Sequence, residues 1–292
     1  MSLSDRVVVT CAITGVLTNP DKYNVPVTPE EMAHATKQAF DQGATIVHAH
    51  FRSQQPGLGM LPTWELNEVG DILTAMREAA PEMIINMSTG VIGEDVSAPI
   101  ACLEAFKPEM AACNAGSLNY LKIRSDGQWA WPPILFDNPV EKVEKFVATM
   151  AANDIVPEFE CFDTGIIRSV GMYKANGMFK GAPHLSFVMG VDSGMPARAD
   201  LLPILTDELP ENANWQVIAT GSGREKIWEL HRAAVALGGN VRTGLEDTFY
   251  LPTGEKATDN GQLVEALVNI VRDLGKEPAS PKETREKLGI NR

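Results

Sequence analysis

The stretch Thr45-Ile46-Val47-His48-Ala49-His50 guides the interpretation of the rest of the chain, because an apolar, β-branched run leads directly into two histidines. In a β-strand, residues i and i+2 point to the same face, so His48 and His50 would present two imidazoles side by side at the strand's end. Two neutral imidazoles on one face are suited to zinc. The alternative is a pair of polar residues where a strand meets water.

Strand-like and helix-like segments alternate on both sides of this stretch. Ahead of it, Thr28-Pro29-Glu30-Glu31 predicts a helix start, with threonine as the N-cap and glutamate three residues later. Strands are expected at Val7–Ile13, Thr45–His50, Met83–Ser88, Met110–Ala112, Ile155–Phe162, Leu185–Met189, Trp215–Ala219 and Asn240–Thr243. Helices are expected at Thr28–Gln42, Glu65–Ala80, Pro99–Phe106, Val140–Ala152, Ile166–Lys174, Ala199–Leu205, Arg224–Leu237 and Gly261–Leu274.

Eight strand-then-helix units thus fill the 292 residues. Short apolar strands that alternate with helices imply a parallel sheet, and eight units in this length favour a closed (β/α)8 TIM barrel over an open sheet. No linker or low-complexity tract divides the sequence, so we expect residues 1–292 to form a single barrel domain. The loop Phe51–Thr63 and a C-terminal helical tail after Lys276 are expected as additions to it.

The charge balance argues against several classes of partner. The chain has 38 acidic and 25 basic residues and a formal net charge of −13, which disfavours nucleic acid and polybasic contact with a membrane. No apolar run approaches the about 20 residues of a membrane span, and no signal peptide is evident. Cys11, Cys102, Cys113 and Cys161 lack close-pair spacing. We therefore expect buried, reduced thiols in a cytoplasmic protein.

Polar residues gather at the expected carboxyl ends of the strands, where barrel enzymes carry their chemistry. Besides the two histidines they are Asn86, Ser88, Asn114, Ser117, Glu158, Glu160, Asp192, Ser193, Thr220, Arg242, Glu246 and Asp247. The other histidines are expected elsewhere. We place His34 and His231 on helix surfaces, and His184 at the start of a strand, on the wrong side of the barrel for ligation.

The fifth strand carries two acidic residues. In Pro157-Glu158-Phe159-Glu160-Cys161-Phe162 the glutamates share one face, while Phe159 and Cys161 share the other. Helices cover the outside of a barrel, so both carboxylates should point inward. Buried carboxylates are costly unless they are paired or bound to a cation. The pattern predicts either a structural ion pair, with an inward arginine, or a role in substrate binding or metal support.

The segment Val241-Arg242-Thr243-Gly244-Leu245-Glu246-Asp247 is a second dense cluster of charge. Because the last strand of a closed barrel pairs with the first, a carboxylate here lies near the histidine strand and could supply a third metal ligand. Two histidines and one carboxylate leave a position open for a substrate oxygen. By pattern alone, a solvated loop carboxylate is the alternative.

Two glycine-rich turns precede late helices, Gly190-Val191-Asp192-Ser193-Gly194 and Gly221-Ser222-Gly223-Arg224. Backbone N–H groups at such helix starts favour anions, and two of them on adjacent late strands are typical of a barrel phosphate site. Glycine turns are also common without any ligand. The residues that we assign to cofactor binding are Gly190, Ser193, Gly194, Gly221 and Arg224.

Taken together, these motifs resemble the β-keto acid cleavage enzymes, a family whose founding activity cleaves 3-keto-5-aminohexanoate. The resemblance runs along nearly the whole chain, in order and at the family's spacing. The matching blocks are Ala12–Gly15, Pro26–Glu31, Gly43-Ala44 before His48-Ala49-His50, Asn86–Gly90, Pro157–Asp163 and Gly238–Asp247. The last block is the most specific.

The resemblance implies a (β/α)8 barrel assembled as a homotetramer, with zinc held by His48, His50 and Glu246. It implies condensation of a β-keto acid with acetyl-CoA, giving acetoacetate and a new acyl-CoA. In the family mechanism Asp247, assisted by Arg242, removes a proton next to the ketone, and the resulting carbanion attacks the thioester. CoA thiolate then cleaves the intermediate in a retro-Claisen step.

The resemblance also extends to substrate contacts. Ser88 and Asn114 match positions that hold the keto-acid portion, and we assign Ser117 to the same role. A glutamate of the fifth strand matches the position that senses the variable end of the substrate, and either Glu158 or Glu160 could fill it. Glu160 is also the second candidate for the catalytic base.

Several positions depart from the family pattern. Arg52-Ser53 replaces the common Arg-Asp pair, Asn240 and Thr248 replace a frequent histidine and asparagine, and Val16-Leu17 stands where some members carry a glutamate. The metal residues are intact, so these departures concern the identity of the keto acid.

Two other functions compete with this interpretation. A metal-dependent hydrolase of the amidohydrolase type also uses His-x-His in a barrel, but on the first strand and with further histidines at later strand ends. A non-catalytic ligand-binding barrel would not require Arg242, Glu246 and Asp247 beside a metal.

Overall fold

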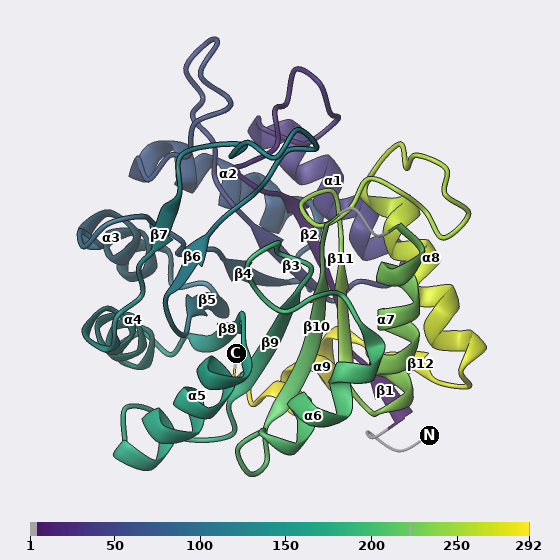
Figure 1. The fold of residues 1–292 in the computed structure, drawn as a ribbon. Coiled ribbons are helices and arrows are strands. Elements are labelled where there is room, and N and C mark those ends of the chain that lie inside the picture. Colours follow the sequence, from purple (N-terminus) through teal and green to yellow (C-terminus); the bar gives the residue numbers. More distant parts are fainter. Residues whose placement is uncertain (1–4, 222–223, 292) are drawn as a thin grey trace.

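The structure is a computed structural model that describes residues 5–221 and 224–291. Within them, eight parallel strands close into a barrel with helices around the outside (Figure 1). In barrel order the strands are β2 (Val9–Thr14), β3 (Ile46–Ala49), β4 (Ile84–Met87), β5 (Met110–Asn114), β8 (Val156–Cys161), β9 (His184–Met189), β10 (Asn214–Ala219) and β11 (Asn240–Thr243). The pairing of β11 with β2 completes the barrel. The predicted (β/α)8 TIM barrel is confirmed.

The helices occupy the predicted positions to within a few residues. They are α1 (Pro29–Asp41), α2 (Leu66–Ala79), α3 (Ser97–Phe106), α4 (Val140–Ala152), α5 (Thr164–Asn176), α6 (Leu202–Asp207), α7 (Arg224–Ala236) and α8 (Asn260–Asp273). The start of α1 shows why sequence located it. The Thr28 hydroxyl accepts a hydrogen bond from the Glu31 N–H, and the Glu31 carboxylate accepts one from the Thr28 N–H.

The C-terminal tail closes the amino end of the barrel. Strand β12 (Glu277–Pro278) pairs with β1 (Arg6–Val7), and α9 (Pro281–Leu288) follows it. One apolar cluster joins this tail to the first residues of the barrel strands; its members are Val8, Ile46, Ile84, Met110, Ala279, Leu288 and Ile290. The tail therefore seals one end of the barrel and leaves the carboxyl ends of the strands for a site.

A β-hairpin that the sequence analysis missed stands between β5 and α4. It consists of β6 (Leu118–Tyr120) and β7 (Ile134–Phe136), which pair antiparallel. An Asp126-Gly127 dipeptide lies between the strands, and Gly127 has a φ of 82°. Asp-Gly between short apolar runs is a recognised hairpin signal, so the pattern was available in the sequence.

The histidines outside the predicted metal pair need one correction. His34 is exposed on α1 and His184 begins β9, as expected. The prediction for His231 is wrong, because its side chain is fully buried on the inner face of α7 and packs edge-on against Trp228. His231 follows Ile227 and Trp228 by four and three residues, which places it on the apolar face of the helix.

The four cysteines are buried and unpaired, as predicted. Within the described ranges, no helix combines the length and the apolar character that a membrane crossing requires.

Candidate active site

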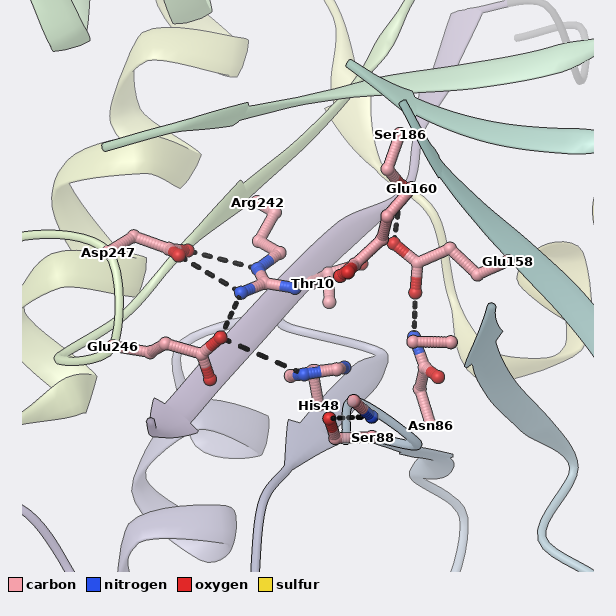
Figure 2. A network of polar contacts seen from close by, with 12 residues as sticks. Thr10, His48, Asn86, Ser88, Glu158, Glu160, Ser186, Arg242, Glu246 and Asp247 are labelled. Carbon is pink, nitrogen blue, oxygen red and sulfur yellow. Dashed lines mark hydrogen bonds and ion pairs between the residues drawn. The ribbon is translucent and has the colours of Figure 1, made fainter. Parts of the chain in front are cut away.

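The two histidines of β3 face a carboxylate that follows β11. The ring centroids of His48 and His50 lie 5.3 Å apart. Oε1 of Glu246 is 3.8 Å from Nε2 of His48 and 3.5 Å from Nε2 of His50, and Figure 2 shows the carboxylate pointing toward the His48 ring. One ligand atom from each of the three residues lies within 4.8 Å of the others. The predicted trio therefore converges on one point.

The protonation states of His48 and Glu246 suit a metal ion. Burial, followed by the charge of Arg242, lowers the pKa of His48 to about 3, so its imidazole is neutral. Burial alone would raise the pKa of Glu246, but Arg242 and both histidines outweigh it and hold that pKa well below its usual range. Oε2 of Glu246 is buried and has no hydrogen-bond partner among the residues described. The neutral imidazole of His48 and an ionised carboxylate with a free oxygen, with the ring of His50 beside them, fit a divalent cation such as zinc.

A glycine turn sets the position of Glu246. Gly244 has a φ of 146°, and a Cβ atom there would lie 2.1 Å from the carbonyl oxygen of Ala12. This close approach brings the turn after β11 against β2, where the Glu246 N–H donates to the same Ala12 oxygen at 3.2 Å. The buried side chain of Asn260 fastens the turn further, because it accepts from the Leu245 N–H at 2.9 Å.

Arg242 lies at the centre of the charged groups. Its guanidinium donates from Nε and Nη2 to the two oxygens of Asp247, each at 3.0 Å, and from Nη2 to Oε1 of Glu246 at 2.7 Å. Nη1 lies 3.6 Å from Oε1 of Glu160. Arg242 is 2% exposed, so these contacts are made in a desolvated setting (Figure 2). One arginine thus orients three carboxylates around the metal candidate.

The carboxyl groups of Asp247 and Glu160 have pKa values that are raised toward neutral pH. Burial and the nearby Glu246 raise the pKa of Asp247 to about 6, although Arg242 opposes the shift. Burial raises the pKa of Glu160 to about 8, with Arg242 again opposing it. Groups with such pKa values exchange protons readily at neutral pH, as general acids and bases must.

Glu158 has different surroundings from Glu160, although both point inward. Its carboxylate accepts hydrogen bonds from the side chains of Asn86 and Ser186, and from Nε2 of Gln216 at 2.7 Å. Gln216 in turn accepts from the Thr10 hydroxyl at 3.1 Å. Glu158 is completely buried and does not line the cavity described below. The structure therefore places this carboxylate in the barrel interior, beneath the site.

A cavity of about 790 Å³ opens at the carboxyl end of the barrel. His50, Glu160, Arg242, Glu246 and Asp247 all line it. Its size is within the range of small-molecule sites. The cavity thus gives a ligand access to the metal candidate and to both groups with raised pKa values at once.

The predicted substrate contacts divide into two sets. Ser88 and Asn114 line the cavity, and the side-chain oxygen of Asn114 is buried with no hydrogen-bond partner in the described chain. The side chains of both lie near Gly90, because Ser88 Oγ and Asn114 Nδ2 are within 4 Å of the point where a Cβ atom on residue 90 would lie. Ser117 lies outside the cavity, where its hydroxyl accepts from the Asn138 N–H at 2.7 Å.

The first glycine-rich turn uses its polar groups internally. The Gly190 N–H donates to the Met195 carbonyl at 2.7 Å, and the Gly194 N–H to the Val191 carbonyl at 2.9 Å. The Ser193 hydroxyl accepts from the Leu121 N–H at 3.1 Å. The N–H groups of Gly190 and Gly194 are therefore used within the turn, while the Ser193 hydroxyl keeps its own hydrogen to donate. In the second turn Gly221 is exposed, while Ser222, Gly223 and the side chain of Arg224 lie outside the described residues.

Sequence reasoning passed over one residue that organises the mouth of the cavity. Arg52, noted above only as the neighbour of the departing residue Ser53, is 1% exposed. It donates to Thr14 Oγ1 and the Gly59 carbonyl at 3.0 Å each, to the Thr18 carbonyl at 2.9 Å, and to the Gly15 carbonyl. It thereby fixes the loop after β2 to the loop after β3. A charged residue directly after His50-Phe51 was the available signal.

Comparison with known proteins finds similar sequences along nearly the whole chain. A family profile described as beta-keto acid cleavage enzyme matches residues 6–290. The 3-keto-5-aminohexanoate cleavage enzyme of Acetoanaerobium sticklandii is 31% identical over 293 residues, covering 99% of this chain and 100% of that protein. The 3-oxoadipate:acetyl-CoA acetyltransferase of Cupriavidus necator is 32% identical over 288 residues, covering 97% of this chain and 94% of that protein.

Among solved structures, the binary complex of ObcA with oxaloacetate aligns with a TM-score of 0.71 at 18% identity. The alignment covers 91% of this chain and 67% of that chain. This likeness concerns the fold alone.

Proposed function

The chain belongs to the β-keto acid cleavage enzyme family, and we propose that it condenses a β-keto acid with acetyl-CoA to give acetoacetate and a new acyl-CoA. The observation that carries the proposal is that two groups of residues, a potential metal site and a potential catalytic base, meet at one cavity. The His48–His50–Glu246 trio and the Arg242–Asp247 pair both line or adjoin it. The relative named as an acetyl-CoA acetyltransferase supports acetyl-CoA as the second substrate.

We propose that His48, His50 and Glu246 hold zinc, which when bound supplies Lewis acidity at the keto oxygen of the acid. Ser88 and Asn114 are placed to bind the polar end of the acid, because both present side-chain polar atoms to the cavity. These contacts would fix the C2 hydrogens of the acid relative to the carboxylates opposite.

Asp247 is the proposed base. Arg242 holds both of its oxygens, which orients the carboxylate toward the cavity, while burial keeps its pKa at about 6. By taking a proton from C2, Asp247 generates the carbanion that attacks the acetyl thioester, and the released CoA thiolate then cleaves the bond between C2 and C3. Glu160, whose pKa is about 8, keeps its proton at neutral pH and lines the same cavity, so it is the proposed donor to the C2 carbanion that cleavage leaves on acetoacetate.

The hydrolase alternative is not favoured by the family match or by the position of the histidines. His48 and His50 end the second barrel strand, β3, rather than the first. His184 lies at the amino end of β9, with Cα pairing to Glu158 rather than to a residue at the mouth.

The proposal is tested by incubating the zinc-loaded protein with a set of β-keto acids, with and without acetyl-CoA, and analysing CoA esters by mass spectrometry. We expect the acid to be consumed only when acetyl-CoA is present, with equal amounts of acetoacetate and a new acyl-CoA. Consumption without acetyl-CoA, and with release of free carboxylic acids, would instead support a hydrolase.

We further propose that the protein is a homotetramer in solution. Multi-angle light scattering of the purified protein measures its mass directly. A mass of one or two chains would contradict this proposal.

A further inference from the structure

The cavity holds charge in one place only. Its charged or titratable lining residues are His50, Glu160, Arg242, Glu246 and Asp247, apart from the phenol of Tyr120. All of them belong to the cluster that the proposed reaction uses. The other described residues that line the cavity are neutral, and many of them are aromatic or aliphatic. We call this set the neutral wall.

The charged groups of this cluster mostly contact one another, and two of their atoms that lack a hydrogen-bond partner in the described chain, Oε2 of Glu246 and Nη1 of Arg242, are buried within the cluster. Arg242, the lining cation, already contacts three carboxylates at 2.7 to 3.6 Å. Glu246 and Asp247 are both bound by Arg242, and Glu160 faces its Nη1. Among the lining residues that the structure describes, the cation available to a second substrate carboxylate is Arg242, whose one unbonded group, Nη1, lies within the cluster at 3.6 Å from Glu160. An ammonium group would have to compete with Arg242 for a carboxylate.

The neutral wall extends from the mouth to the base of the cavity. Trp64, Tyr120, Trp131 and Phe136 are among the lining residues, and the last three come from the β6–β7 hairpin and its loop. At the base, Val188 and Ile218 are 6% and 2% exposed, and Ile218 pairs in register with Arg242.

The acid is the smaller of the two substrates, so we assign the buried part of the neutral wall, including Val188 and Ile218, to it. The exposed apolar residues at the rim, Leu17 and Ile92, remain for the arm that carries the thioester; they are 75% and 67% exposed. The group of the acid beyond its keto carbon, its tail, therefore extends away from the charged cluster along an apolar surface. Burying an unpaired charge there would be costly.

We propose that the acid accepted by this site carries a neutral, apolar alkyl or aryl group beyond its keto carbon. Acids with an ammonium group or a second carboxylate at that position are poor ligands. The inference rests on the proposed function, which supplies the β-keto acid, and it selects among acids that differ only in their tails.

Three acids of equal chain length test it: 3-oxohexanoate, 3-oxo-5-aminohexanoate and 3-oxoadipate. With acetyl-CoA, we expect kcat/KM for 3-oxohexanoate to exceed that of either charged acid by at least about 30-fold, the scale expected for one desolvated, unpaired polar group. Comparable or higher values for a charged acid would overturn the inference while leaving the reaction itself established.

Binding without turnover separates this inference from the reaction. Trp64 and Trp131 line the cavity, so quenching of tryptophan fluorescence can report the Kd of each acid in the absence of acetyl-CoA. Tighter binding of 3-oxohexanoate supports the inference even if no acyl-CoA forms, in which case the proposed reaction alone is refuted. Equal or weaker binding than the charged acids refutes the inference.

A pair of variants tests whether the wall is the cause. Val16 lines the cavity and is half-buried, next to Gly15, whose Cβ position is 2.7 Å from Cγ of Glu246. Leu135 is 55% exposed on the hairpin and lies outside the cavity. The quantity compared is the ratio of kcat/KM for 3-oxohexanoate to kcat/KM for 3-oxo-5-aminohexanoate. We expect Val16→Glu to lower this ratio at least about 5-fold, because the new carboxylate in the cavity lining attracts the ammonium group. Leu135→Glu should leave the ratio unchanged. An equal ratio in both variants would contradict the assignment.

Discussion

Replacing Asp247 by asparagine isolates the role of the proposed base. The side chain keeps its shape but can no longer accept a proton. In the native structure both Asp247 oxygens accept from Arg242 at 3.0 Å. In Asp247→Asn one of these acceptors becomes an NH2 group that faces an N–H donor, so one charge-assisted hydrogen bond is lost. Such a bond is worth about 1.5–3 kcal/mol.

Two effects of different size should follow. The free energy of unfolding should fall by about 2 kcal/mol, which in a protein of this size lowers the melting temperature by about 3 °C. The loss of the base should slow proton abstraction far more, by about 10²- to 10⁴-fold. Zinc should remain bound, because His48, His50 and Glu246 are unchanged.

The assay is exchange of deuterium from solvent into C2 of a β-keto acid without acetyl-CoA, measured by NMR and corrected for the uncatalysed rate. Asp192→Asn is the matched control, because Asp192 is exposed at the same end of the barrel and does not line the cavity. Exchange by Asp247→Asn as fast as by the control would refute the assignment. It would move the role of base to Glu160, the other cavity carboxyl with a raised pKa.

Three further changes test other parts of the account. His50→Ala should lose most bound zinc in elemental analysis while keeping its melting temperature, whereas His34→Ala, an exposed control, should retain the metal; full occupancy in both would exclude the proposed ligand set. Glu158→Leu removes a carboxylate that accepts three hydrogen bonds in the barrel interior. We expect the free energy of unfolding in urea to fall by about 3–5 kcal/mol. An unchanged urea midpoint would show that this network is not needed for stability. Arg52→Ala removes four hydrogen bonds that join two loops at the cavity mouth, so KM should rise at least about 10-fold with a smaller change in kcat, and an equal KM would mean that these loops need no such tie.

Short-range patterns were sufficient to predict most of the architecture. The alternation of apolar strands with capped helices fixed all eight barrel strands to within a few residues. The i, i+2 rule placed His48 and His50 on one face, and closure of the barrel between β11 and β2 brought Glu246 to them. These features depend on periodicity and on neighbouring strands, both of which can be inferred from a single sequence.

Depth within the barrel could not be inferred in the same way. The period of a strand shows that Glu158 and Glu160 share a face, but not that a two-residue step separates the barrel interior from the cavity. Backbone hydrogen bonds inside a turn are equally invisible to sequence. The N–H groups of Gly190 and Gly194 looked available to an anion, and both are used within the loop. Such features depend on three-dimensional packing rather than on residue type.

The origin of the acetoacetate carbons tests the central claim most directly. The protein is incubated with an unlabelled β-keto acid and acetyl-CoA that carries ¹³C at both acetyl carbons, and the products are analysed by NMR and mass spectrometry. If the carbanion formed at C2 attacks the thioester, both labelled carbons must appear at C3 and C4 of acetoacetate, and the acyl group of the new CoA ester must be unlabelled. Label in the acyl group of the new ester, or unlabelled acetoacetate, would contradict the proposed condensation and cleavage.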